Sequence, residues 1–175
     1  IYMANQTEVS KPIITAYAGM YKPNSEEPLE QTPYKMVARK FMDYGGIVFA
    51  PTHIPAWESL TRPIPARFVS GHFYFTLGIH CKEYVYDPNL YFQGDEISLS
   101  LRSYSLGYDL FHPHRTVVWH EYTREGRSKH WNDFQRPEHN KINKSWLDMD
   151  KESKARLRQL LGTEDNGSVS YTHLT

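Results

Sequence analysis

The stretch of residues 86–120 constrains the fold of this chain more than any other part of the sequence. It starts at an Asp-Pro turn and then carries two adjacent acids, Asp95 and Glu96, which favour the positive end of a helix. Apolar residues follow at spacings of four and three, as on the inward face of a helix: Ile97, Leu101 and Tyr104. Gly107 is expected to end the helix as its C-cap, and the segment Arg115–His120 has an apolar strand pattern. The sequence therefore predicts a helix that begins at the two acids and leads to a strand ending at a histidine.

The rest of the chain alternates strand patterns with one further helix pattern. Strands are predicted at Ile13–Ala18, Tyr34–Tyr44, Gly46–Pro51 and Ala66–Leu77. The second and third strands join at a Gly45-Gly46 turn, and Ser70-Gly71 interrupts the fourth, which is typical of close approach by backbone or ligand. A helix is predicted at Asp150–Leu161, capped by Asp150 and ended by Gly162, and loops at Tyr21–Pro33 and Thr52–Pro65. Strands and helices mixed in this order predict an α/β fold.

The charge balance restricts the partners of this chain. It carries 20 basic and 20 acidic residues, so it lacks the basic excess that a nucleic-acid or anionic-membrane surface normally needs. No apolar run approaches the ~18 residues of a membrane span, and no signal-peptide pattern is visible. The single cysteine, Cys81, excludes an intramolecular disulfide and suits a reducing compartment. We therefore expect no nucleic-acid partner, no membrane span and a cytoplasmic location.

The two ends of the chain differ from its central part. We expect residues 1–162 to form one unit and residues 163–175 to be a disordered tail. The last residues, Ser168–Thr175, resemble translated adapter sequence and are left out of the fold prediction. Because Ile1 is not an initiator methionine, we expect the chain to be an N-terminally truncated fragment.

Asp95 and Glu96 are the first candidates for chemistry. Adjacent carboxylates at a helix N-terminus usually serve only the helix dipole. In a functional interpretation, one carboxylate hydrogen-bonds sugar hydroxyls while the positive end of the helix faces phosphates. The residues alone leave both interpretations open.

His120 is the second candidate. A histidine that ends an apolar strand is usually a rim or core residue, but imidazole is a common metal ligand and ligands gather at strand ends. His112 and His114 alternate on an extended segment, which would suit a metal hydrolase, although no committed carboxylate lies nearby. Arg124 and Arg127 are candidates for neutralising a diphosphate.

Several common catalytic signatures are missing from the sequence. No nucleophile elbow surrounds Cys81 or a serine, and there is no P-loop, G-x-G-x-x-G fingerprint or C-x-x-C motif. These absences leave a sugar site as the most specific prediction.

Six segments share their order with a known enzyme family: RFVSGHFYFTLG at 67–78, YDP at 86–88, FQGDE at 92–96, SLRSYSLGYDLFHP at 100–113, VVWHEYTR at 117–124 and SKARLRQLLG at 153–162. They resemble the GlcNAc-type glycosyltransferase family, which includes hydroxyproline N-acetylglucosaminyltransferases and bacterial relatives. The order is also similar to the carboxy-terminal half of the catalytic domain of polypeptide N-acetylgalactosaminyltransferases.

The resemblance implies the carboxy-terminal, acceptor-side part of a GT-A fold, with a mixed sheet and flanking helices. It also implies an activity: transfer of GlcNAc or a related sugar from UDP-GlcNAc to a hydroxyl of a protein or glycan. A divalent metal such as Mn²⁺ and retention of the anomeric configuration are implied as well.

The resemblance also implies roles for individual residues. Asp95 and Glu96 take the catalytic position, and His120 takes the position of a metal ligand. The substrate-binding positions fall on Ser70, Gly71, His72, Gly94 and Arg124. The segment Gln93–Glu96 departs from the G-G-E-N pattern of the more distant family, so it does not assign separate roles to the two acids.

The largest departure concerns the D-x-D motif that binds metal in GT-A enzymes. Its one occurrence, Asp148-Met149-Asp150, precedes the last predicted helix, where helix capping explains it better. We therefore expect the nucleotide-binding half to lie upstream of Ile1 and the fragment alone to be inactive. The alternatives are a non-catalytic carbohydrate- or protein-binding module on the same scaffold and a His-based metal hydrolase.

Overall fold

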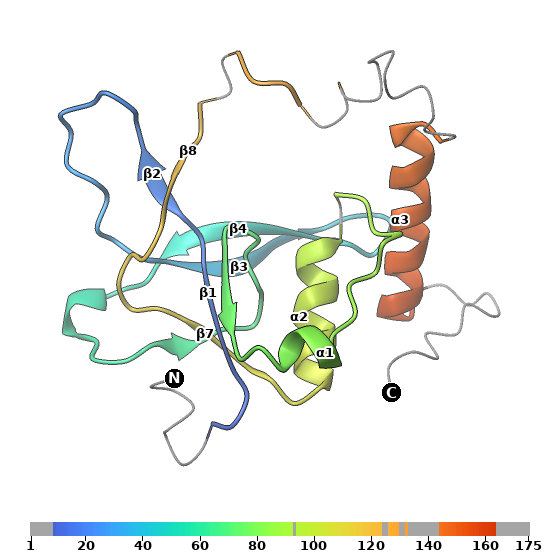
Figure 1. Cartoon of the computed structure of the whole chain (residues 1–175), viewed down its shortest axis with the longest axis horizontal. Helices are drawn as coiled ribbons and strands as arrows, with labels where there is room; N and C mark the ends of the chain where they lie inside the picture. Colours follow the sequence, from blue (N-terminus) through green and yellow to red (C-terminus); the bar gives the residue numbers. More distant parts are fainter. Residues whose placement is uncertain (1–8, 93, 124–125, 130–131, 133–143, 164–175) are drawn as a thin grey trace.

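A mixed four-stranded sheet is the frame of the molecule (Figure 1). The computed structural model describes residues 9–92, 94–123, 126–129, 132 and 144–163. The sheet order is β5-β7-β1-β6, formed by Ile64–Pro65, Asp109–His112, Pro12–Ala16 and Phe73–Thr76. β1 and β7 run parallel, with Ile13 opposite Leu110, whereas the two outer pairs are antiparallel. This arrangement confirms the predicted α/β class and the predicted mixed sheet.

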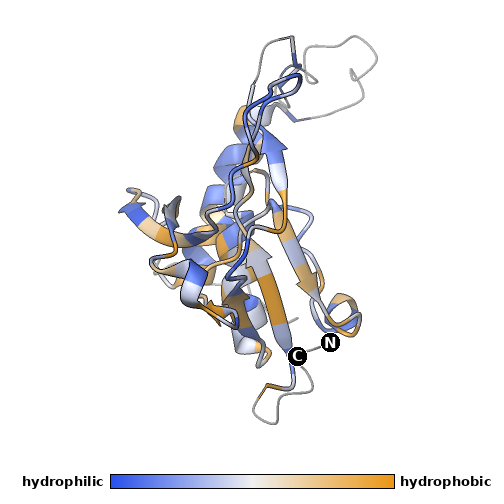
Figure 2. Cartoon of the chain, turned by 90° about the vertical axis from the view of Figure 1, so that its left-hand side faces the viewer, coloured by the Kyte–Doolittle hydropathy of each residue, from blue (hydrophilic) through white to orange (hydrophobic). Residues whose placement is uncertain are grey.

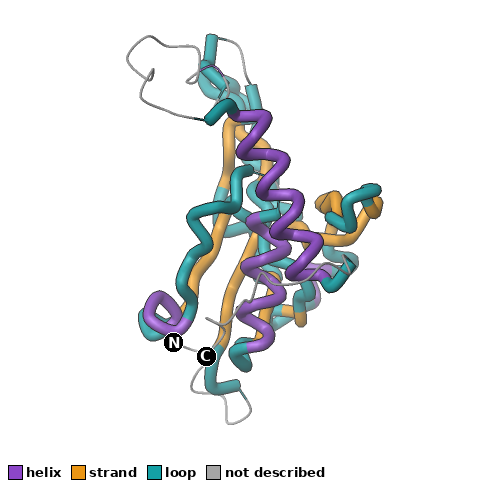
Figure 3. Tube along the Cα trace, turned by 90° about the vertical axis from the view of Figure 1, so that its right-hand side faces the viewer, coloured by secondary structure: helices purple, strands orange, loops and turns teal. Residues whose placement is uncertain are grey.

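In the described part of the chain, two long α-helices and one short one accompany the sheet. They are α1 (His80–Glu83), α2 (Asp95–Ser105) and α3 (Trp146–Leu161). Figure 3 looks onto the side that carries the long helices and shows them in front of the strands. The bounds predicted for α2 are confirmed, since the helix starts at Asp95 and Gly107 lies just beyond its end with a φ of 81°. The predicted inward face is wrong for two of its three residues, because Ile97 is buried but Leu101 and Tyr104 are 38 % and 74 % exposed. Apart from Ile97, the buried residues of the helix are polar or charged: Ser98, Ser100, Arg102 and Ser103.

The core lies between the sheet and α2. Its centre is a cluster of four side chains that are at most 6 % exposed: Ile13, Val69, Tyr108 and Leu110. Full burial of one large apolar side chain stabilises the folded state by roughly 1.5–3 kcal/mol. Figure 2 shows that hydrophobic residues are concentrated along the strands. This core fixes the sheet against the helix whose first residues are the two candidate acids.

A hairpin of β3 (Tyr34–Phe41) and β4 (Ile47–His53) is attached to the sheet through His112. The Met36 N–H donates to His112 Nε2 at 3.1 Å, and His112 Nδ1 lies 2.9 Å from the Thr15 carbonyl oxygen. The predicted glycine turn is confirmed, because Gly45 has a φ of 81° and its N–H bonds the Met42 carbonyl oxygen. His112 therefore bridges β1 and β3 inside the fold.

A two-stranded parallel ribbon, β2 (Gly19–Tyr21) and β8 (Trp119–Glu121), extends away from the two long helices (Figure 1). Met20 lies opposite His120 in its register. The Trp119 Nε1–H donates to the Glu30 carbonyl oxygen at 2.8 Å, which ties β8 to the loop between β2 and β3. His120 thus lies on a strand, as predicted, but in a separate small sheet.

The predicted strand Ala66–Leu77 is wrong in its first half, since only Phe73–Thr76 is strand. Side chains take the backbone donors that a sheet would need. The Val69 N–H donates to Ser100 Oγ, and the Gly71 N–H donates to Glu96 Oε1. The backbone of this segment is therefore bonded to side chains of α2 and not to a neighbouring strand.

Other parts of the secondary structure also differ from the prediction. The strand predicted at Arg115–His120 is Trp119–Glu121, and β7 was not predicted because its ends are the polar residues of Asp109–His112. The loop predicted at Thr52–Pro65 contains a 3-10 turn at Trp57–Ser59 and β5. Asp150 does not cap α3. The cap is Ser145, whose hydroxyl accepts from the Asp148 N–H while the Asp148 carboxylate accepts from the Ser145 N–H.

Helix α3 is the last element that the structure describes. Gly162 ends α3 in the left-handed conformation, as predicted. The tail predicted at 163–175 lies outside the described residues except for Thr163. Within the described part of the chain, no helix has the length and apolar character needed to cross a membrane.

Candidate active site

Four aromatic side chains meet beside β6 and β8. Tyr17 follows β1 and His72 precedes β6, and these two strands pair antiparallel with Ala16 opposite Phe73, so the two rings are brought together at one edge. The ring centroids of Tyr17 and His72 are 4.4 Å apart. His120 stacks on His72 at 5.3 Å, and Tyr122 contacts the three other rings at 4.7 to 5.9 Å.

These rings line a hollow of about 480 Å³, which we call the aromatic hollow. A hollow of this size accommodates a small ligand. Its further lining residues are Phe92, Glu121, Thr123, Arg127, Ser128 and Lys129. The Glu121 carboxylate accepts hydrogen bonds from Thr123 and Arg127. An apolar wall with a polar, partly basic rim suits a ligand that combines an apolar face with hydroxyl or phosphate groups.

The His72 ring has a defined tautomer. Its Nδ1 accepts a hydrogen bond from the Ala18 N–H at 3.2 Å, so the proton of the neutral ring lies on Nε2. Partial burial, and to a smaller extent the nearby His120 ring, lowers the pKa of His72 below its usual value. His72 is therefore a neutral hydrogen-bond donor at neutral pH.

Tyr122 holds the wall together. Its hydroxyl donates to the Ala18 carbonyl oxygen at 2.8 Å, and its ring stacks on Tyr17 with 11° between the planes. Burial, followed by the interaction with Tyr17, raises the pKa of Tyr122 above its usual range. The hydroxyl therefore stays protonated and keeps its donor role.

The two predicted acids are the first residues of α2, and Glu96 contacts the residue next to His72. Glu96 Oε1 accepts from the Gly71 N–H at 2.7 Å, and Gly71 is the neighbour of His72. Burial raises the pKa of Glu96, the Gly71 N–H opposes this shift, and the adjacent Asp95 carboxylate adds to it. A carboxylate whose pKa is raised by burial is a candidate for proton transfer.

Asp95 lies in a similar environment. Burial raises its pKa, and a hydrogen bond from Tyr86 partly opposes the shift. Its Oδ1 atom is buried and has no hydrogen-bond partner among the described residues. A buried carboxylate oxygen without a partner disfavours the ionised form of Asp95, in the same direction as burial does.

Helix α3 fastens the loop that leads to these acids. Arg156 donates to Asp87, and the Tyr91 N–H donates to the fully buried Ser153 hydroxyl at 3.0 Å. Gly94 packs against the Leu157 side chain. The loop runs between α2 and α3 in Figure 1, so α3 determines where α2 starts.

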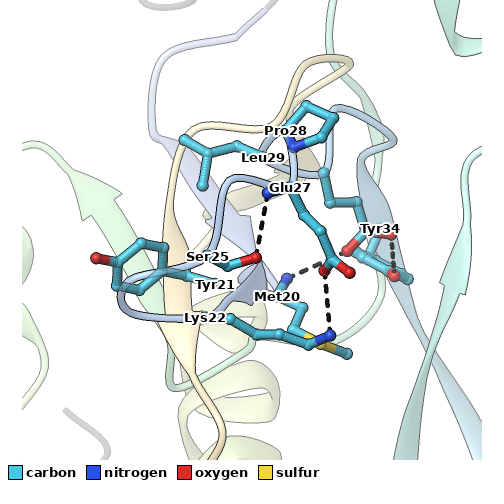
Figure 4. A pocket seen from close by; sticks show the side chains of 9 residues that line it. Met20, Tyr21, Lys22, Ser25, Glu27, Pro28, Leu29 and Tyr34 are labelled. Atoms are coloured by element: carbon cyan, nitrogen blue, oxygen red, sulfur yellow. Dashed lines mark hydrogen bonds and ion pairs between the residues drawn. The ribbon is translucent and has the colours of Figure 1, made fainter.

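A second hollow, of about 500 Å³, lies between β2 and the loop that follows it. Figure 4 shows its side chains, which include the exposed Met20, Tyr21 and Leu29. Its charged groups already have partners. Lys22 bonds Glu27 at 3.1 Å, and the Glu30 carboxylate accepts from the Tyr34 hydroxyl and the Met20 N–H. This hollow is lined by two carboxylates and one basic side chain, whereas the aromatic hollow has one carboxylate and two basic side chains, so it is the weaker candidate for an anionic ligand.

The family model described as Glycosyltransferase (GlcNAc) matches residues 1–173. The chain belongs to the GlcNAc glycosyltransferase family. Membership indicates an enzyme that uses a sugar donor and an acceptor. Comparison with curated proteins and with solved structures gave no match.

The predicted substrate-binding residues of this family member lie in different places. His72 lines the aromatic hollow, and Gly71 joins it to Glu96. Ser70 is fully buried and bonds Thr15, so it supports the turn from behind. Gly94 precedes α2 with a φ of 96°. Arg124 lies outside the described residues.

The described residues do not form a metal site on their own. No group of three or more His, Cys, Asp or Glu side chains is placed to hold an ion in this part of the chain. His120 has His72 as its neighbour, but His72 uses Nδ1 as a backbone acceptor and carries its proton on Nε2. The prediction that His120 binds a metal therefore requires ligands from outside the described residues.

Sequence reasoning missed seven residues that line the aromatic hollow: Tyr17, Phe92, Glu121, Tyr122, Thr123, Ser128 and Lys129. Tyr122 had a local signal, because it lies two residues after His120 and alternate residues of a strand share a face. Tyr17 had none, since its place depends on the pairing of β1 with β6. His112, one of the two histidines considered for a hydrolase metal, bonds through both ring nitrogens and so has no lone pair for a metal.

Proposed function

We propose that this protein transfers GlcNAc, or a closely related sugar, from a UDP-sugar to a hydroxyl group, with retention of the anomeric configuration. The donor sugar is bound at the aromatic hollow. The observation that carries the proposal is the bond between Glu96 and the Gly71 N–H. It joins a carboxylate with a raised pKa to the wall formed by His72 and His120.

The chemistry of transfer needs few protein groups. The bond between the anomeric carbon and the diphosphate oxygen breaks, a bond to the acceptor oxygen forms, and the acceptor hydroxyl loses its proton. A carboxylate with a raised pKa, Glu96 or Asp95, is a better acceptor for this proton or for a sugar hydroxyl. The Nε2–H of His72 donates to a ligand oxygen, and the basic rim residues Arg127 and Lys129 favour the diphosphate.

We propose further that the mixed sheet and α2 form the acceptor-side part of a GT-A fold. The order of elements supports this assignment: a turn lined by small residues, an acid-led helix with the buried Arg102, and a later strand that carries His120. Asp148-Met149-Asp150 is a poor candidate for the metal motif, since Asp148 is the capping-box partner of Ser145 at the start of α3 and Asp150 pairs with Lys154.

The decisive experiment measures UDP release and sugar transfer by the full-length protein with UDP-GlcNAc, in the presence and absence of Mn²⁺. Glu96→Gln and His120→Ala are expected to abolish both activities. Phe75→Ala, at an exposed ring on β6, is the matched control and is expected to keep them. Unchanged activity in both site variants would overturn the assignment.

One observation favours a second candidate, a non-catalytic carbohydrate-binding module. Among the residues that the structure describes, those that line the aromatic hollow include neither Asp95 nor Glu96. A module of this kind binds UDP-GlcNAc without releasing UDP, and Glu96→Gln leaves its affinity unchanged. Calorimetric titration beside the turnover assay separates the two functions.

A further inference from the structure

Phe92 has an unusual backbone conformation. Its φ is 55°, in the left-handed region that bulky side chains rarely adopt. Its ring is 63 % exposed, so burial in the core does not offset the strain. The ring instead lines the aromatic hollow, together with His72 and His120. Strained residues of this kind persist where the surrounding structure imposes them, and they cluster at ligand sites.

The backbone on both sides of Phe92 is fastened to α3. On one side, the Tyr91 N–H donates to the buried Ser153 hydroxyl at 3.0 Å. On the other, Gly94 is packed so closely that a Cβ there would lie 3.2 Å from Leu157 Cδ2. Two contacts with one helix thus hold the backbone near the strained residue, whose ring lines the hollow.

The position of Phe92 in the chain indicates which part of a ligand it meets. Asp95 and Glu96 follow it by three and four residues, and carboxylates bind the hydroxyls of a sugar. An aromatic ring provides the complementary apolar surface for the C–H face of the same sugar. The basic rim residues Arg127 and Lys129 come from a different segment and suit the diphosphate.

We propose that Phe92 is a specificity-determining residue whose ring packs on the apolar face of the donor sugar, and that α3 holds it there. This inference rests on the proposed function. It adds a ligand contact that lies outside the predicted acids and histidines, and it assigns a positioning role to Ser153 and Leu157.

The test compares Phe92→Asn with Phe92→Tyr in the full-length protein, with Phe75→Ala as the control at another exposed ring. Asparagine tolerates a positive φ but has no ring, whereas tyrosine keeps the ring. Calorimetry measures Kd for UDP-GlcNAc and for UDP alone, and thermal unfolding measures Tm.

Phe92→Asn is expected to weaken UDP-GlcNAc binding by about tenfold, to leave UDP binding unchanged and to keep Tm at or above that of the wild type. Phe92→Tyr and Phe75→Ala are expected to bind like the wild type. An unchanged Kd for UDP-GlcNAc in Phe92→Asn overturns the inference, and so does an equal loss for UDP or a fall in Tm. If the wild-type protein binds no UDP-GlcNAc, the proposed function fails instead.

Discussion

Arg156 in α3 donates two hydrogen bonds, from Nε at 2.8 Å and from Nη2 at 2.6 Å, to one carboxylate oxygen of Asp87. The other oxygen of Asp87 accepts from the Asn89 N–H at 3.0 Å. Asp87 is 7 % exposed, so its charge depends on these donors. The Asp-Pro turn at the start of the central stretch is therefore held by a helix that begins almost sixty residues later.

Removing this arginine should destabilise the fold. Arg156→Ala leaves the Asp87 carboxylate buried without its charged partner, and we expect the free energy of unfolding to fall by about 2 kcal/mol. Arg156→Lys keeps the charge but not the paired geometry, so its loss should be smaller. Urea unfolding monitored by circular dichroism measures both changes.

The matched control for this prediction is Lys144→Ala. Lys144 pairs with Glu152 on the surface, where both side chains are more than half exposed, and such pairs contribute little. A loss in Arg156→Ala no larger than in Lys144→Ala would show that the contact with Asp87 does not anchor the loop.

His112 should matter for stability even though it takes no part in the proposed chemistry. His112→Leu keeps the apolar volume but leaves the Met36 N–H and the Thr15 carbonyl oxygen without their partner. We expect the free energy of unfolding to fall by about 2–4 kcal/mol, because both groups are in the interior. Denaturant unfolding of His112→Leu beside His114→Ala checks this, and a similar small effect in both variants would contradict it.

The fold was predictable from the sequence where its signals are local. The start of α2 follows from two adjacent acids and its end from Gly107, and the β3–β4 turn follows from Gly45. The α3 cap was also local, since Ser145 and Asp148 have the spacing of a capping box, but the prediction began at Asp150.

Other parts depend on contacts that no local pattern contains. Val69 and Gly71 have strand-like neighbours, yet their N–H groups bond side chains of α2, about 30 and 25 residues away. The candidate site likewise combines residues that local motifs identify with contacts that only the fold creates. His72 and His120 were identified from separate motifs, but their stacking depends on two sheets that pair distant segments.

Gly94 offers a test of the contact between the loop and α3. Gly94→Ala introduces a Cβ at a φ of 96° and 3.2 Å from Leu157 Cδ2, so we expect a loss of about 1–2 kcal/mol in unfolding free energy. Gly107→Ala is the control, because Gly107 has a φ of 81° but no heavy atom within 4 Å of its Cβ position. Equal losses in the two variants, measured by urea unfolding, would show that Leu157 does not restrict this position.

Glu96 should give the fold a specific pH dependence. Burial raises its folded-state pKa above the ordinary value of 4.5. Between these two values the folded chain still holds a proton that the unfolded chain has released, so stability falls as the pH rises through this window. Below the ordinary pKa both states are protonated, and the contribution no longer changes with pH.

Glu96→Gln separates this titration from the hydrogen bond, because the amide oxygen can still accept from the Gly71 N–H. We expect the variant to lose less stability than the wild type as the pH rises from ~4 to ~7, with the difference growing across the window. Urea unfolding at a series of pH values measures the effect. Glu26→Gln, at an exposed side chain, controls for the lost charge and should follow the wild-type profile. Parallel profiles for Glu96→Gln and the wild type would mean that burial does not shift the Glu96 pKa, and would remove a main support for its role in proton transfer.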